Sequence, residues 1–218
     1  MSPKRRVIGI DESGKGDFFG PLVIASFLAD DAELGRLKSL GVKDGKLLSD
    51  SRLQDLDRAL RQSYPHALVV ISPESYNKKY DEIRNLNKLL AEGHAVAIDQ
   101  LLAKHSADVA ISDKFGKAEL IESALSNQKH RIELEQIVRG ESIAQVAAAS
   151  ILARARFIRE LDKLSARFNR ILPRGAAPAV DAAGRELVRD QGMKVLSVVA
   201  KLHFKNYRRI INPDLFTR

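Results

Sequence analysis

The sequence contains no cysteine and no long apolar run. Without cysteine the chain has no disulfide framework, no zinc–thiolate site and no thiol catalysis. No segment is long and apolar enough to span a bilayer, and the apolar run that follows the basic N-terminus is too short for a signal peptide. We therefore expect a soluble, cytoplasmic protein that does not associate with membranes.

Acidic residues are fewer than basic ones, which gives the chain a formal charge of +8 and a pI near 9.7. The basic residues cluster near positions 4–6, 154–159 and 201–209. Such clusters favour a nucleic-acid partner, although a basic surface without a partner is the alternative. The hydrophobic content of 44% is too high for a disordered chain, and 218 residues predict a single domain over positions 1–218.

The spacing of apolar residues along the chain, alternating in some segments and helical in others, predicts an α/β fold with an early antiparallel strand pair. Apolar runs predict strands at residues 6–10, 21–28, 67–72, 108–113 and 131–138. Helical spacing and capping residues predict helices at 31–40, 50–64, 73–83, 86–104, 117–126, 142–168, 181–190 and 192–203. The C-terminal part, from about 170 to 218, is therefore basic and mainly helical, and its tail from 203 onward is predicted to be irregular.

Carboxylates stand at three comparable places along the chain. Asp11 and Glu12 end the first strand, Asp113 ends a middle strand, and Glu141 follows a glycine just before a long helix. Acids at strand ends can converge on one point, and a cluster of like charges persists when a cation compensates it. Oxygen ligands select Mg²⁺ or Mn²⁺, and a pair of such ions can hydrolyse a phosphodiester. The alternative is that each acid is a surface turn residue.

A glycine-rich loop, Gly14-Lys15-Gly16, directly follows the first acidic pair. It matches neither the Walker A pattern nor GxGxxG. Its backbone can closely approach a sugar or phosphate, with Lys15 adding charge. An ordinary turn between two strands is the alternative, and on these three residues alone the turn is favoured.

Six segments together resemble the type 2 ribonucleases H, which comprise ribonucleases HII and HIII. They occur in the family's order over nearly the whole chain: GIDESGKGDFFGP at 9–21, KDGKLLS at 43–49, YN at 76–77, NLNKLLAEGHA at 85–95, ES followed by VAAASILAR at 141–154, and AKLHF at 200–204. The form GKGDFFGP and the AKLHF segment are similar to ribonuclease HIII rather than HII.

This resemblance implies a ribonuclease H-like fold, with a mixed sheet, flanking helices and a helical C-terminal part. It implies an endonuclease that uses Mg²⁺ or Mn²⁺ to hydrolyse the RNA strand of RNA–DNA hybrids, leaving 5′-phosphate and 3′-hydroxyl ends. The implied metal ligands and catalytic residues are Asp11, Glu12, Asp113 and Glu141. The implied substrate contacts are Gly14, Lys15, Gly16, Lys46, Ser150 and Arg154, with the glycine loop against the ribose 2′-hydroxyl.

Several alternatives stay open beside this resemblance. Cleavage at single embedded ribonucleotides, as in ribonuclease HII, is one. A non-catalytic nucleic-acid-binding module and a related nuclease that cuts DNA are the others. Only the first few residues precede the first expected strand, so we expect the chain to lack the TBP-like N-terminal domain of ribonuclease HIII, and we expect a monomer. His94 is predicted to be a packed helix residue, and Asp17 to form hydrogen bonds within its loop.

Overall fold

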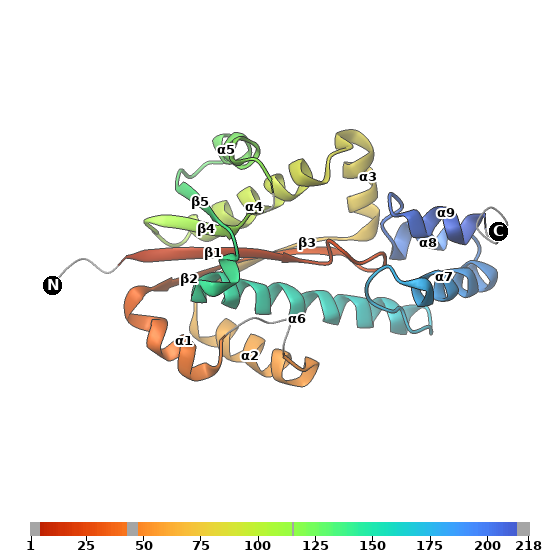
Figure 1. Ribbon diagram of the computed structural model, residues 1–218, viewed down its shortest axis with the longest axis horizontal. Coiled ribbons are helices and arrows are strands. Elements are labelled where there is room, and N and C mark those ends of the chain that lie inside the picture. The colour runs from red at the N-terminus through yellow and green to blue at the C-terminus, as the bar shows by residue number, and fades with distance from the viewer. Residues whose placement is uncertain (1–4, 43–47, 115, 213–218) are drawn as a thin grey trace. The chain divides into compact units, whose positions relative to one another are not determined.

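The computed structural model describes residues 5–42, 48–114 and 116–212, and its strands form one five-stranded mixed sheet (Figure 1). The order across the sheet is β3-β2-β1-β4-β5. The strands are β1 (Arg6–Ser13), β2 (Leu22–Asp30), β3 (His66–Ile71), β4 (Val109–Asp113) and β5 (Glu133–Ile137). All five lie where the sequence predicts strands. The neighbouring inner strands β1 and β2 are buried along their apolar runs, β2 over nearly its whole length and β1 from Val7 to Ile10.

Up to α7 the helices begin and end close to the predicted positions. They are α1 (Leu34–Leu40), α2 (Asp50–Ser63), α3 (Pro73–Ile83), α4 (Leu86–Leu102), α5 (Ala118–Ser126), α6 (Ala144–Arg167), α7 (Pro178–Gln191), α8 (Val195–Val199) and α9 (Lys205–Ile211), with short 3-10 helices at Asp31–Glu33 and Gly140–Ser142. The side chains of Ser49, Ser72 and Asn85 cap α2, α3 and α4 by accepting backbone N–H bonds. Among the helices of the described residues, none combines the length and apolar composition needed to cross a bilayer.

Contacts divide the chain into two compact units. The first contains residues 23–69 and 85–155 together with β1 up to Glu12, and therefore most of the sheet. The second contains residues 13–22 and 70–84 and everything from Arg156 onward. The expectation of a single domain over 1–218 stays a prediction.

In the first unit, helices cover both faces of the sheet (Figure 1). The start of α6 lies with α1 and α2 on one face, where Val7, Val109 and Ile111 pack with Val146. On the other face α4 packs against β2, and the buried Ser26 hydroxyl donates a hydrogen bond to the Ala97 carbonyl at 2.8 Å. These contacts fix the edge of the sheet at which β1 and β4 end.

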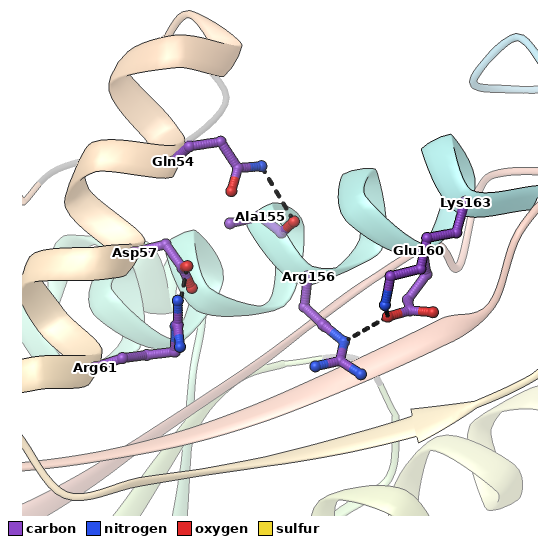
Figure 2. Close-up of polar contacts among 7 residues, drawn as sticks. All are labelled: Gln54, Asp57, Arg61, Ala155, Arg156, Glu160 and Lys163. Atoms are coloured by element: carbon purple, nitrogen blue, oxygen red, sulfur yellow. Dashed lines mark hydrogen bonds and ion pairs between the residues drawn. The ribbon is translucent and has the colours of Figure 1, made fainter. Parts of the chain in front are cut away.

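A polar contact also attaches α2 to α6 within this unit (Figure 2). The Gln54 side-chain amide donates to the backbone carbonyl of Ala155 at 3.3 Å. On the same helix Arg61 forms an ion pair with the buried carboxylate of Asp57, with 3.0 Å between Nε and Oδ2. The pairing compensates a charge that burial alone would disfavour.

The C-terminal part of the second unit differs from the prediction. The helix expected at 192–203 is limited to Val195–Val199, and α9 occupies part of the tail that was expected to be irregular. The side chains of Asn206 and Arg209 both donate to the buried carboxylate of Asp181 on α7, at 2.6 Å each. The prediction was wrong because contacts with α7, and not periodicity in the tail itself, stabilise α9.

Candidate active site

The parallel pairing of β1 with β4 brings two predicted carboxylates to the same edge of the sheet. In this register Ile10 lies opposite Ser112. The next residues along the two strands are Asp11 and Asp113, and neighbouring strands lie about 4.8 Å apart. Two acids that are far apart in the sequence therefore lie close together on adjacent strands, Asp113 at the end of β4 and Asp11 near the end of β1.

A tight turn just before Glu141 presses against the end of β4. The Gly140 backbone N–H donates to Asp113 Oδ1 at 3.1 Å. A Cβ at Gly140 would lie 2.9 Å from the Asp113 Cα, so only glycine permits this approach. Arg139, just before it, has a left-handed backbone with φ of 60°, and such local strain is typical of functional turns. The turn thus places Glu141 next in sequence to a residue that contacts Asp113.

Glu12 directs its carboxylate toward helix α4. Neighbouring residues on a strand face opposite ways, which separates Glu12 from Asp11. Glu12 Oε2 lies 3.1 Å from Nε2 of His94, whose side chain is 1% exposed. His94 is packed in a helix, as predicted, but no local sequence pattern indicates its contact with a predicted metal ligand 82 positions away.

The environment of Asp11 opposes a negative charge. Burial, followed by the neighbouring Glu12 carboxylate, raises the pKa of Asp11 from 3.8 to about 6. A hydrogen bond from the Ser150 side chain, one from the Glu12 backbone and the nearby His94 act in the opposite direction. Ser150, predicted as a substrate contact, thus hydrogen-bonds a candidate metal ligand. A cation at this position would remove the electrostatic penalty.

The raised pKa of Asp11 predicts a pH-dependent stability. Because the folded-state pKa of about 6 lies above the unfolded value of 3.8, the contribution of Asp11 to stability is greatest below pH 4 and is lost as the pH rises through 6. Without divalent ions, Asp11→Asn is expected to be more stable than the wild type at pH 7 by up to about 3 kcal/mol. Urea unfolding of both proteins from pH 4 to 8 in a chelator measures this difference. Parallel pH profiles would contradict it.

Replacing His94 by leucine is expected to weaken metal-dependent activity. Glu12 would lose the N–H that orients its carboxylate, and loss of such a partner typically lowers metal affinity or activity about 10- to 100-fold. The Mn²⁺ concentration at half-maximal activity is the readout. His130→Leu is the matched control, because it removes a histidine paired at 2.8 Å with a different carboxylate, Asp99. Equal Mn²⁺ responses of both variants would refute a role for His94.

The four predicted acids offer the donor set of a hard divalent cation. All their donors are oxygens, which suit Mg²⁺ or Mn²⁺, and the raised pKa of Asp11 marks an uncompensated negative charge. Within the described ranges no three His, Asp or Glu side chains already converge as a ligand group. The residues fit such an ion by chemistry and by strand placement, and their side chains are expected to turn toward it.

The predicted substrate contacts are distributed over both units. Gly14, Lys15 and Gly16 belong to the second unit, and Arg154 lies on α6 in the first. Lys46 lies outside the described residues. Further along α6, Arg156 forms an ion pair with Glu160 at 2.9 Å, so its charge is partly neutralised (Figure 2).

Comparisons with known proteins agree on one family. A family model for ribonuclease HII matches residues 8–207. The chain is 44% identical over 206 residues to ribonuclease HIII of Chlamydia abortus, a match that covers 93% of this chain and 69% of that relative. It is 32% identical to Bst-RNase HIII crystallised in complex with Mn²⁺, with a TM-score of 0.90 over 98% of this chain and 71% of that one. Ribonuclease H2 of Pyrococcus horikoshii, 23% identical, shares the fold with a TM-score of 0.81 over 97% of this chain and 100% of that one. The predicted ribonuclease H-like fold is confirmed.

Proposed function

We propose, since the chain belongs to the ribonuclease HII family and is a metal-dependent ribonuclease H, that it cuts the RNA strand of RNA–DNA hybrids by two-metal-ion hydrolysis. The products would carry 5′-phosphate and 3′-hydroxyl ends. The observation that supports this proposal best is the placement of Asp11 and Asp113 on adjacent strands near one edge of the sheet, with the backbone of Gly140, the residue before Glu141, bonded to Asp113. A related structure that contains Mn²⁺ supports the use of a divalent ion.

In this proposal the chain's own residues hold and orient the catalytic ions. Asp11 and Asp113 would present carboxylates from the adjacent strands β1 and β4, Glu141 would add its own from the 3-10 helix Gly140–Ser142, and Glu12 is oriented by His94. Two Mg²⁺ or Mn²⁺ ions held by these carboxylates would supply an activated water for in-line attack and would stabilise the leaving 3′-oxygen. No side chain is needed as a nucleophile.

The remaining predicted contacts would position the substrate. The backbone of the glycine loop is proposed to approach the ribose 2′-hydroxyl, the group that distinguishes RNA from DNA. Lys15, Lys46 and Arg154 would pair with phosphates, so binding should weaken as the salt concentration rises. These contacts need no base-specific hydrogen bonds, so cleavage should depend little on sequence.

A panel of end-labelled substrates tests this function. It comprises an RNA strand paired with DNA, a single ribonucleotide within duplex DNA, and plain duplex DNA, each with Mg²⁺ and with Mn²⁺. Cleavage of the RNA tract alone is expected. Efficient cleavage at the single ribonucleotide would instead assign a specificity of the ribonuclease HII type. Cutting of plain DNA, or no cleavage of the hybrid with either metal, would overturn the proposal.

A further inference from the structure

A lysine without solvent exposure lies beneath the segment that follows the glycine loop. Lys201 has an exposed fraction of 0%. Its ammonium donates to the backbone carbonyl of Asp17 at 2.8 Å and to that of Gly20 at 2.7 Å. These two carbonyls are the ends of the bent segment Asp17–Gly20, called the Asp17–Gly20 turn below, which begins immediately after Gly16. A single side chain thus joins both ends of that turn.

The backbone around Lys201 reinforces the same contact. The Lys201 N–H donates to the Phe18 carbonyl at 2.9 Å, and the Gly20 N–H donates to the Val199 carbonyl at 2.8 Å. Phe19 and Ala200 form an isolated antiparallel bridge. The segment 199–201 therefore lies against the turn as a short strand would.

The Asp17–Gly20 turn is also connected to the glycine loop. The Asp17 N–H donates to the Gly14 carbonyl at 3.3 Å, which closes the loop over Lys15 and Gly16. Asp17 Oδ1 accepts a hydrogen bond from the Gly175 N–H at 2.6 Å, so Asp17 forms loop hydrogen bonds as predicted. Movement of the Asp17 carbonyl would therefore move the loop.

Filling space does not explain a lysine at this position. Burial lowers the pKa of Lys201 to about 7, with Asp17 acting in the opposite direction, so burying this amine is unfavourable for the fold. Methionine would occupy a similar volume without that penalty. The contribution of the lysine therefore lies in its N–H donors, and its ammonium also lies 5.7 Å from the centre of the Tyr76 ring.

We propose that Lys201 is a positioning residue for the substrate, which fixes the Asp17–Gly20 turn and thereby holds the glycine loop ready to receive the ribose-phosphate backbone. This inference rests on the proposed function, since it assigns the loop to substrate binding. Lys201 is fully buried and acts through the loop's backbone without touching the substrate. Its loss should therefore affect the binding of the hybrid more than the chemical step.

Lys201→Met is the direct test, with steady-state cleavage of an RNA–DNA hybrid as the readout. We expect KM to rise about five- to tenfold while kcat and the Mn²⁺ response stay within about twofold of the wild type. Amide exchange at Phe18 and Gly20 should become at least about tenfold faster, while exchange in β4 stays unchanged. Tyr76→Phe is the neutral control, because it keeps the ring and removes a hydroxyl that has no hydrogen-bond partner among the described residues.

Two further variants separate positioning from general loss of stability. Leu53→Ala removes a buried side chain of α2 and destabilises the protein. The KM of this variant should stay unchanged. Asn77→Ala leaves Lys201 intact but removes its support, because the Asn77 amide donates to the Ala200 carbonyl and accepts from the Leu202 N–H, both at 2.9 Å. We expect KM to rise in Asn77→Ala as well. This variant therefore tests the positioning role if Lys201→Met does not fold.

The outcomes distinguish this inference from the proposed function. If the wild type cuts the hybrid and Lys201→Met has an unchanged KM, or a lowered kcat alone, the positioning role is refuted. If amide exchange at Gly20 in Lys201→Met matches the wild type, Lys201 does not fix the Asp17–Gly20 turn. If the wild type does not cut the hybrid, the proposed function fails, and the substrate role of Lys201 fails with it, whatever the exchange data show.

Discussion

Asp113→Asn is expected to reduce cleavage of an RNA–DNA hybrid by at least about a thousandfold, since a bound metal ion contributes several kcal/mol to stabilising the transition state. Asparagine keeps the shape of the side chain and an oxygen that can accept from the Gly140 and Lys114 N–H groups, as Asp113 Oδ1 now does. The substitution therefore removes a charge and leaves the turn in place. Single-turnover cleavage in saturating Mn²⁺ measures the loss.

Asp108→Asn is the matched control for this substitution. Asp108 lies just before β4, at the opposite end from Asp113, and Asp108 Oδ2 accepts a hydrogen bond from the Arg6 N–H at 2.6 Å. Its replacement should leave cleavage within about twofold of the wild type, because no catalytic ion is proposed there. A similar loss of activity in both variants would show that charge on the strand, and not a metal ligand, is responsible.

Gly16→Ala is expected to reduce cleavage about 10- to 100-fold without destabilising the protein. The added Cβ would keep the substrate away from the backbone, and the expected loss is that of one hydrogen bond to a charged group. A Cβ at Gly16 would meet nothing within 4 Å, and its backbone is not in the left-handed region. The fold therefore does not require glycine at this position, whereas close approach of a substrate does. Cleavage rates and urea unfolding midpoints measure the two effects separately.

Gly14→Ala should show the opposite balance. Gly14 has φ of +90°, and a Cβ there would lie 2.2 Å from the Pro21 carbonyl oxygen. We expect a loss of about 2–3 kcal/mol in the free energy of unfolding from strain and the clash. Gly35→Ala, at another open position, is the control for both and should leave activity unchanged. Equal stability losses at Gly14 and Gly16 would contradict the assignment of Gly16 to the substrate.

Local patterns predict most of the secondary structure of this chain. Leu53, Leu56 and Leu60 recur at helical spacing after the Ser49 cap, and α2 follows them. Continuous apolar runs likewise mark β1 and β2, because strands buried on both faces need no polar alternation. These elements follow from residues close together in sequence.

The site depends on contacts that local patterns do not contain. The sequence places Asp11 and Asp113 at strand ends, but their adjacency requires the parallel register of β1 and β4. The contact between His94 and Glu12, and the burial of Lys201 beneath the Asp17–Gly20 turn, join residues far apart along the chain. Clustered basic residues predict solvated side chains, which is why Lys201 was grouped with the basic cluster at 201–209.

The claim that catalytic ions act directly on the scissile phosphate is best tested by thio substitution. A hybrid with one phosphorothioate of defined configuration at the cleavage site would be cut under single-turnover conditions with Mg²⁺ and with Mn²⁺. Sulfur binds the softer Mn²⁺ better than Mg²⁺. We predict that one diastereomer is cut at least about a hundredfold more slowly than the all-oxygen substrate with Mg²⁺, and that Mn²⁺ restores most of the rate. The same Mg²⁺-to-Mn²⁺ rate ratio for both diastereomers and the all-oxygen substrate would contradict direct metal contact and, with it, the proposed catalytic role of the carboxylates.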